Sequence, residues 1–251
     1  MSDVTLITGA SAGLGVEFAR QLSARGDQLV LVARRKDRLE ALARELGNAR
    51  AVALDLAQPG SGERLMADLA TWGETPATLI NNAGFGTFGK FDAADPAKLR
   101  AMIDLNCGTL TDLCHAVAPQ MIERRRGDIL NVASTAAFQA GPGMAVYFAT
   151  KAYVLSLSEA LHEEYKPHGI TVTCLCPGPT STEFGEVAGF AGKGMFDKIA
   201  MDAGRVVEIG LKAMDKNRAV VVAGALNKVG VALTRLVPRA LTRKIAGSLK
   251  L

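Results

Sequence analysis

Residues 4–15 read V-T-L-I-T-G-A-S-A-G-L-G, an apolar and β-branched run that leads directly into a turn with three glycines. The run predicts a buried strand over 4–8, and the amphipathic stretch after it predicts a helix over 13–25. Gly9, Gly13 and Gly15 would let the backbone turn tightly and would leave the first N–H groups of the helix facing the turn. This unit is therefore a candidate site for a pyrophosphate. An ordinary turn is the alternative, but it explains three glycines in seven residues less well.

The same alternation of apolar runs and amphipathic stretches continues along the chain. Further strands are expected at 28–33, 50–54, 77–80, 127–133, 170–176 and 218–223, and helices at 36–46, 60–71, 96–125, 147–166 and 203–216. Apolar strands flanked by helices are typical of a parallel sheet that is covered on both faces. The sequence therefore predicts an α/β fold, a doubly wound (Rossmann-like) parallel seven-stranded sheet. No linker or repeat divides the chain, so residues 1–251 are expected to form a single domain.

The composition indicates a globular protein, and a cytoplasmic location is expected. Apolar residues make up 49% of the chain and charged residues 22%, so the chain can bury a large core. No apolar run reaches the ~18 residues that span a bilayer, and the N-terminus shows no secretory signal. The four cysteines lack the spacing of a metal site and are expected to pack in the core, so no metal is predicted.

The end of the second predicted strand indicates which dinucleotide such a site would prefer. Arg34 and Arg35 follow that strand, and no acidic residue occupies positions 32–36. A site for NAD usually has Asp or Glu here to bind the ribose 2′-hydroxyl, whereas arginine suits a 2′-phosphate. NADP(H) is therefore favoured over NAD(H), with a solvated basic pair as the alternative.

Two other strand ends are expected at the same edge of the sheet. Asp55, after the third strand, could accept a hydrogen bond from an adenine amino group or could simply close the turn there. Residues 81–84 read N-N-A-G, a sequence that lets the backbone come close to a bulky group at the carboxyl end of the strand.

A second group of polar residues lies between 134 and 151. Ser134 follows the fifth predicted strand, and Tyr147 and Lys151 are four residues apart on the helix expected over 147–166. Residues at this spacing share one helix face, with Cβ atoms roughly 6 Å apart. A free tyrosine has a pKa of about 10, and a nearby ammonium or an oxidised nicotinamide would lower that value. The Tyr-x-x-x-Lys spacing alone would equally fit an amphipathic helix, but the strand-end serine and the glycine turn favour proton transfer.

Taken in order, these motifs resemble the short-chain dehydrogenase/reductase family in its single-domain form. The resemblance runs from Thr5 to about Thr182. Residues 8–15 match T-G-x-x-x-G-x-G, and residues 81–84 match N-N-A-G. Ser134 matches the catalytic serine, and Tyr147 and Lys151 match the Y-x-x-x-K pair. Pro177 and Gly178 match the P-G motif, Thr182 matches the threonine that follows it, and Asn106 matches the catalytic asparagine.

The resemblance implies a role for each of four catalytic positions. Tyr147 would be the general acid in reduction and the general base in oxidation. Lys151 would lower the pKa of Tyr147 and bind the nicotinamide ribose, and Ser134 would hold the substrate carbonyl. Asn106 would anchor a water that links Lys151 to solvent.

The resemblance also implies a set of cofactor contacts. They are Gly9, Ser11, Gly13, Leu14, Gly15, Arg34, Arg35, Asp55, Leu56, Asn82, Ala83, Gly84, Tyr147, Lys151, Pro177, Gly178, Thr180 and Thr182. Thr180 stands where many members have valine, so only its backbone contact is expected. Ala12 stands where some NADP-dependent members have a basic residue, which leaves Arg34 and Arg35 to hold the phosphate.

Residues 179–200 follow the P-G motif, where the family has a mobile substrate lid. The segment is rich in glycine and apolar residues, namely Phe184, Val187, Phe190, Met195 and Phe196. The fold is expected to bring four more apolar residues near it: Phe85, Phe138, Met144 and Val146. An apolar ketone or aldehyde is therefore the expected substrate, with simple packing of the lid as the alternative.

Positive charge is concentrated at the C-terminal end. Residues 212–251 carry nine basic residues and one acidic residue, a net charge of +8, whereas the remainder carries −4. The basic helical tail expected at about 224–251 shows one stripe of Arg235, Arg239 and Arg243, and a second, apolar stripe of Val237, Leu241, Ile245 and Leu249. Three interpretations stay open: docking on the same domain or another subunit, binding to an anionic membrane surface, and recognition of an acidic carrier or acyl-CoA phosphates. Nucleic acid is not expected, since the tail has no aromatic residue.

These features indicate an NADP(H)-dependent oxidoreductase that interconverts an apolar ketone or aldehyde and its alcohol. A 3-oxoacyl reductase acting on acyl carrier or CoA substrates and a hydroxysteroid-type dehydrogenase are narrower alternatives. A non-catalytic NADP(H)-sensing or scaffold protein is the alternative of another class, and the complete catalytic set argues against it. The family resemblance implies a homodimer or homotetramer, assembled through the helices at 96–125 and 147–166.

Overall fold

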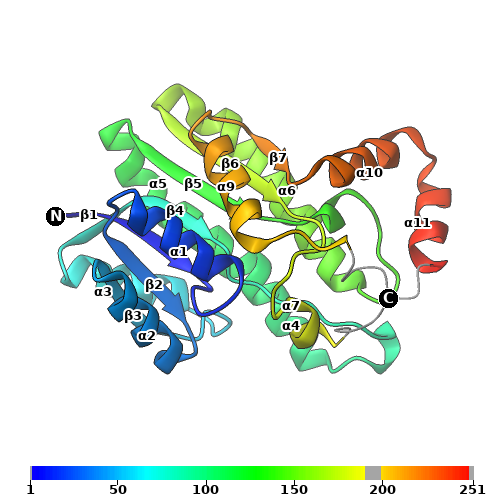
Figure 1. Cartoon of the computed structure of the whole chain (residues 1–251), viewed down its shortest axis with the longest axis horizontal. Coiled ribbons are helices and arrows are strands. Elements are labelled where there is room, and N and C mark those ends of the chain that lie inside the picture. The colour runs from blue at the N-terminus through cyan, green and yellow to red at the C-terminus, as the bar shows by residue number, and fades with distance from the viewer. Residues whose placement is uncertain (1, 190–198, 249–251) are drawn as a thin grey trace.

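A sheet of seven parallel strands forms the centre of the computed structural model, which describes residues 2–189 and 199–248 (Figure 1). The strands are β1 (Ser2–Thr8), β2 (Leu29–Ala33), β3 (Ala49–Ala53), β4 (Glu74–Asn81), β5 (Gly127–Val132), β6 (Ile170–Cys176) and β7 (Val220–Val222). Their order across the sheet is β3-β2-β1-β4-β5-β6-β7. The predicted fold class is therefore confirmed, and each expected strand is present, β6 with the expected bounds and the others with slightly different ones.

Helices cover both faces of this sheet. On one face lie α1 (Leu14–Ala24), α2 (Lys36–Leu46) and α9 (Ala203–Met214), and on the other lie α3 (Ser61–Thr71), α5 (Leu110–Arg124) and α6 (Ala145–Tyr165). Successive strand residues contribute to opposite cores: Leu6 packs toward α5, and Ile7 packs toward α1. This alternation explains why the strands read as continuous apolar runs.

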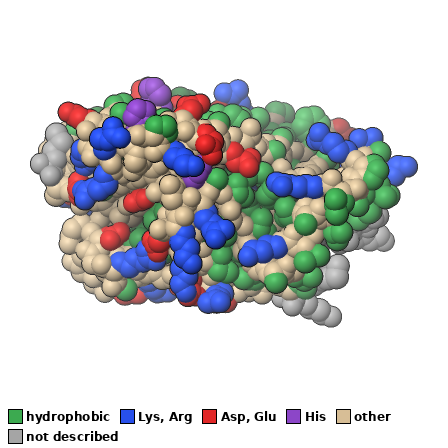
Figure 2. Space-filling model, turned by 90° about the horizontal axis from the view of Figure 1, so that it is seen from above, with side chains coloured by type: hydrophobic (Ala, Val, Ile, Leu, Met, Phe, Trp, Pro, Cys, Tyr) green, Lys and Arg blue, Asp and Glu red, His purple; other side chains and the backbone are tan. Residues whose placement is uncertain are grey.

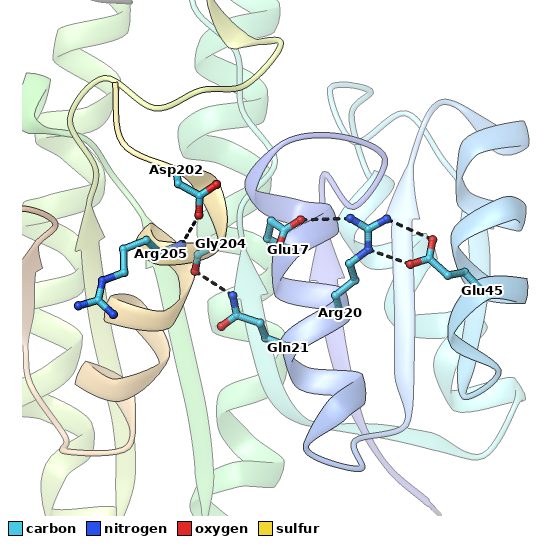
Figure 3. A network of polar contacts seen from close by, with 7 residues as sticks. All are labelled: Glu17, Arg20, Gln21, Glu45, Asp202, Gly204 and Arg205. Atoms are coloured by element: carbon cyan, nitrogen blue, oxygen red, sulfur yellow. Dashed lines mark hydrogen bonds and ion pairs between the residues drawn. The ribbon is translucent and has the colours of Figure 1, made fainter. Parts of the chain in front are cut away.

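Polar contacts join α1 to both of its neighbours (Figure 3). The Nε atom of Arg20 lies 2.8 Å from Oε1 of Glu45 on α2, and Nε2 of Gln21 donates to the carbonyl of Gly204 on α9 at 2.8 Å. Exposed ion pairs stabilise a fold only weakly. The position of α1, which starts at the glycine turn, therefore depends mainly on buried side chains such as Phe18.

The helix predicted over 96–125 is present, but part of it is π-helical and not α-helical. The structure has α4 (Pro96–Ile103), a π-helical turn over Asp104–Thr109, and then α5. A π-helical turn holds an extra residue and rotates the side chains that follow it. The turn carries Asn106 and places it inside the protein, where it is 1% exposed.

Among the described residues, the chain after β6 forms three helices besides α9. They are α7 (Phe184–Ala188), inside the predicted lid, and α10 (Ala225–Leu236) and α11 (Arg239–Ser248), which extend beyond β7 (Figure 1). Phe190, Met195, Phe196 and Leu249 lie outside the described residues. No helix among the described residues has the length and apolar character that crossing a membrane would need.

The tail predicted as two continuous stripes is divided. Val237 is extended, with φ −95° and ψ 136°, because Pro238 follows it and disfavours helical backbone at the preceding residue. Arg235 therefore lies on α10, whereas Arg239 and Arg243 lie on α11. The single basic stripe expected from the sequence does not form.

Candidate active site

The strand order reverses between β1 and β4, and in sheets of this kind ligands bind at the carboxyl ends of such strands. A cleft of about 910 Å³ lies here, within the ~300–1,000 Å³ range of small-molecule and cofactor sites. Its walls include residues from widely separated parts of the chain, such as Gly9, Asn82, Tyr147 and Thr182. The topology thus gathers the predicted motifs at one place.

Thr8 connects β1 to β4 at the base of the cleft. Its Oγ1 accepts hydrogen bonds from the N–H groups of Asn82 and Ala83, each at 3.0 Å, and Nδ2 of Asn82 donates to the Thr8 carbonyl at 2.9 Å. A Cβ at position 9 would lie only 2.9 Å from the Cα of Ala83, and Gly9 has a φ of 67°. A glycine is therefore required where the two strand ends meet.

The glycine turn leaves open space in front of α1. Gly13, with φ 55°, precedes the helix, and no side chain caps its first turn. A Cβ at Gly13 would lie 3.1 Å from the side chain of Thr182 across the cleft. Uncapped N–H groups behind a glycine cradle suit a pyrophosphate, so the residues present fit the dinucleotide that the sequence predicts. Leu14 also lines the cleft, whereas Gly15 does not and lies packed beneath the turn.

Arginines gather where β2 ends. Arg34 and Arg35 both line the cleft, as predicted, and Arg34 is exposed. The Nε atom of Arg35 donates to Oγ of Ser11 at 3.2 Å, and its Nη1 lies 2.8 Å from Oε2 of Glu183. Arg38 of α2 lies 2.6 Å from the other oxygen of Glu183. Sequence reasoning missed Arg38, although its position three residues after Arg35 places both on one side of the helix start.

Asp55 and Leu56 line the cleft at the end of β3. Oδ1 of Asp55 accepts from the N–H of Ala57 at 3.1 Å, and Gln58 donates to Oδ2 at 3.3 Å. The carboxylate therefore closes the strand-end turn, which was one of the two roles that the sequence left open.

Ser134, Tyr147 and Lys151 meet in the same cleft, as predicted. Tyr147 is 8% exposed and Lys151 is 6% exposed. The Nζ of Lys151 donates to the carbonyl of Val132 at 2.7 Å and lies 5.9 Å from the centre of the Tyr147 ring. Oγ of Ser134 accepts from the N–H of Ala136 at 3.1 Å, and Ser134 also hydrogen-bonds Tyr147.

Burial controls the protonation of this group. Burial raises the pKa of Tyr147 to about 12, and the hydrogen bond with Ser134 only partly opposes that shift. Burial also lowers the pKa of Lys151 to about 8. At pH 7 Tyr147 is therefore neutral and Lys151 is mostly charged. This is the opposite of the lowered tyrosine pKa that the sequence led us to expect from a nearby ammonium, because burial is the dominant effect.

Asn106 lies behind the cleft and does not line it. Its Nδ2 donates to Oγ1 of Thr150 and to the carbonyl of Phe85, each at 3.0 Å, and its Oδ1 accepts from the N–H of Phe85 at 3.1 Å. A Cβ at Gly84 would lie 3.0 Å from Oδ1 of Asn106 and 3.6 Å from Nζ of Lys151. Asn106 thus fixes the segment after β4 against α6, close to Lys151.

The segment after β6 supplies the remaining predicted cofactor contacts. Pro177, Gly178, Thr180 and Thr182 all line the cleft. The Pro177 carbonyl accepts from the N–H of Thr135 at 2.8 Å, which ties this segment to the one that carries Ser134.

Apolar side chains surround Tyr147. The ring of Phe184 lies 5.3 Å from the Tyr147 ring, and further lining residues are Phe85, Met144, Phe148 and Ala246. Val146 packs in one apolar cluster with Tyr147 and the lid residue Ala188, as expected, although it lines a second, smaller cavity and not this cleft, whereas Phe138 packs against the main core. Sequence reasoning also missed Ala246, which α11 brings to the cleft.

A doubly wound sheet with a glycine cradle at its switch point and a buried Ser–Tyr–Lys group in the same cleft defines a nucleotide-dependent oxidoreductase. The family described as short chain dehydrogenase matches residues 3–189. The chain belongs to the short-chain dehydrogenase/reductase family, and it is an oxidoreductase that acts on alcohol and carbonyl groups.

Named relatives agree with this assignment. The chain is 36% identical over 189 residues to an NADP-dependent 3-hydroxy acid dehydrogenase of Salmonella typhi, a match that covers 73% of this chain and 75% of the relative. It is 33% identical to a short-chain dehydrogenase from Sphingobium yanoikuyae in complex with NADPH, with a TM-score of 0.81 over 96% of this chain and 98% of that one. A structure from a study of 7β-hydroxysteroid dehydrogenase stereoselectivity gives a TM-score of 0.89 at 28% identity, covering 98% and 97% of the two chains.

Proposed function

We propose that the protein is an NADP(H)-dependent oxidoreductase that interconverts an apolar ketone or aldehyde and the corresponding alcohol, with Tyr147 as the general acid/base. The observation that carries this proposal is the position of the Tyr147 side chain, which lies between the polar pair Ser134 and Lys151 and the apolar ring of Phe184.

The residues of this chain would orient the substrate and move one proton. The dinucleotide, when bound, supplies or accepts the hydride. Ser134 and Tyr147 would both donate hydrogen bonds to the carbonyl oxygen, and in reduction Tyr147 would transfer its proton to that oxygen as the alcohol forms. Lys151, held by the Val132 carbonyl, would stabilise the phenolate that remains, and oxidation would run the same transfer in reverse.

The lining of the cleft supports an apolar carbonyl substrate. Phe85, Met144, Phe148 and Phe184 surround the tyrosine, and none of them carries a charge that could bind an acidic substrate group. The likeness in shape to a protein studied as a 7β-hydroxysteroid dehydrogenase favours a bulky ketone, such as a steroid-like ring, over a 3-oxoacyl chain. Burial destabilises the charged form of Lys151, and a non-catalytic sensor or scaffold would not need a lysine at such a position.

Native enzyme is expected to use NADPH in preference to NADH, and Arg34→Ala or Arg35→Ala should each lower kcat/KM for NADPH about 10- to 100-fold. The values for NADH should stay within about twofold, because only the 2′-phosphate contact is lost. Initial rates with both cofactors measure this. Arg44→Ala is the matched control, since Arg44 is an exposed arginine of α2 that does not line the cleft. Equal use of NADPH and NADH by the native enzyme would refute the preference.

We also propose that the tail binds an anionic membrane surface. Four apolar side chains on α10 are more than half exposed: Leu226 (69%), Val229 (57%), Leu233 (52%) and Leu236 (80%). Basic side chains lie among apolar ones at this end of the molecule (Figure 2), and no acidic residue follows Asp215 in the chain. If the tail docked on the tail of another subunit, the two basic segments would repel each other. An anionic lipid surface would attract the basic residues and accommodate the apolar face of α10. The homo-oligomer expected from the family would use α5 and α6, so it would leave this face free.

The membrane proposal predicts that the protein floats with vesicles containing phosphatidylserine and not with purely zwitterionic ones. Binding should weaken in high salt, because counterions screen the basic residues. The double variant Leu233→Ser, Leu236→Ser should lose flotation, whereas Phe91→Ser, which removes a 66% exposed ring elsewhere, should keep it. Native protein that stays at the bottom with both kinds of vesicle would contradict the proposal and leave docking on a protein partner.

A further inference from the structure

Glu183 links the predicted lid to the arginines at the end of β2. Its two carboxylate oxygens lie 2.8 Å from Nη1 of Arg35 and 2.6 Å from Nη1 of Arg38. Glu183 directly follows Thr182 and precedes α7. Among the described residues, these are the only ion pairs that join residues 179–189 to another element. Within residues 179–189, the Glu183 side chain therefore provides the ionic connection to the cofactor end.

One of these guanidinium groups, that of Arg35, lies at the proposed 2′-phosphate site. Arg35 lines the cleft beside Arg34, and Arg38 shares Glu183 with it. The bonds to Arg35 and Arg38 hold the pKa of Glu183 below its ordinary value, so this side chain is charged at neutral pH. Carboxylate and phosphate use the same guanidinium donors, and they repel each other when close. The two anions cannot both occupy these N–H groups.

We infer that the Glu183 carboxylate competes with the 2′-phosphate of NADP(H) for Arg35 and Arg38, so that Glu183 sets the affinity for the phosphorylated dinucleotide and leaves the arginines when it binds. This inference rests on the proposed preference for NADP(H). Release of Glu183 would free the residue that precedes α7, which couples occupation of the cofactor end to the start of the lid.

Arg35 has a second anchor that would keep it in place. Its Nε donates to Oγ of Ser11 at 3.2 Å, and its Nη2 donates to the Ser11 carbonyl at 3.3 Å. Ser11 belongs to the glycine turn, so the guanidinium stays at the cleft without Glu183. Loss of the carboxylate should therefore expose a positioned arginine and not a disordered one.

Glu183→Gln tests the inference by isothermal titration calorimetry. The Kd values for NADPH and for adenosine 2′,5′-bisphosphate should fall about fivefold, because the competing charge is gone. The Kd values for NADH and adenosine 5′-monophosphate, which lack the 2′-phosphate, should change less than about 1.5-fold, and this also shows that the variant is folded. Glu186→Gln is the matched control: it removes the same charge from α7, at an exposed residue that also lines the cleft but makes no ion pair among the described residues.

Three outcomes overturn the inference. Unchanged affinity for the 2′-phosphorylated ligands would mean that no competition exists, and weaker affinity would mean that Glu183 orients the arginines for the phosphate. An equal gain in Glu186→Gln would assign the effect to general charge and overturn it as well. If the proposed preference for NADP(H) is wrong, the native protein will bind NADPH and NADH with equal Kd. That result is distinguishable from a failure of the Glu183 inference, which concerns the variant.

Discussion

Tyr147→Phe is expected to lower kcat for reduction of an accepted ketone about 10³-fold, because the variant has no proton to give to the developing alkoxide. The Kd for NADPH should stay within about twofold. The ring itself is retained, so its contact with Phe184 at 5.3 Å and its edge contact with Phe148 at 6.1 Å are kept, and the fold should not change. Single-turnover rates with saturating NADPH, together with calorimetric binding, separate the loss of chemistry from a loss of cofactor.

Tyr153→Phe provides the control for this experiment. Tyr153 lies on the same helix and loses the same hydroxyl, which bonds Oγ1 of Thr111 at 2.8 Å outside the cleft. This variant should retain native turnover. If Tyr147→Phe kept its rate, Tyr147 would not be the acid, and the proposed mechanism would be wrong.

Gly15→Ala is expected to lower the free energy of unfolding by about 3 kcal/mol and to weaken dinucleotide binding at least about tenfold. A Cβ at this position would overlap the carbonyl oxygen of Gly9 and lie 2.8 Å from its carbonyl carbon. Both contacts are backbone, so the glycine turn itself would have to move, and with it the cradle in front of α1. Denaturant unfolding and calorimetry with NADPH measure the two effects.

Gly230→Ala is the corresponding control. Gly230 is exposed on α10, and nothing lies within 4 Å of a Cβ built there. Alanine favours helix over glycine, so this variant should be as stable as the native protein or slightly more stable. A Gly15→Ala protein with native stability and native affinity would show that the turn can relax at no cost.

The sequence predicted the strands and the chemistry better than it predicted the walls of the cleft. Gly9, Gly13, Tyr147 and Lys151 were recognisable because each acts through local geometry: a turn, a helix start, or a spacing of four residues. The strand alternation then placed these motifs at one edge of the sheet. No long-range contact had to be known for these conclusions.

The features that the sequence did not predict depend on contacts between distant segments or on small changes of backbone. Arg38 meets Glu183 across 145 residues of chain, and no local pattern marks that pair. The π-helical turn at Asn106 differs from an α-helix by one extra residue, which the apolar pattern over 96–125 does not reveal. Phe138 ends a short 3-10 turn before a loop, where neither helical nor strand periodicity applies, so the direction of its side chain could not be inferred.

The arrival of α11 at the cleft has an evolutionary consequence. The match to the family described as short chain dehydrogenase ends at residue 189 and includes the residues proposed for proton transfer, whereas Ala246 belongs to the part beyond it. Changes in the last quarter of the chain can therefore reshape what enters the pocket while the inherited reaction stays intact. The catalytic apparatus and substrate selection can diverge at different rates in descendants of one ancestral gene.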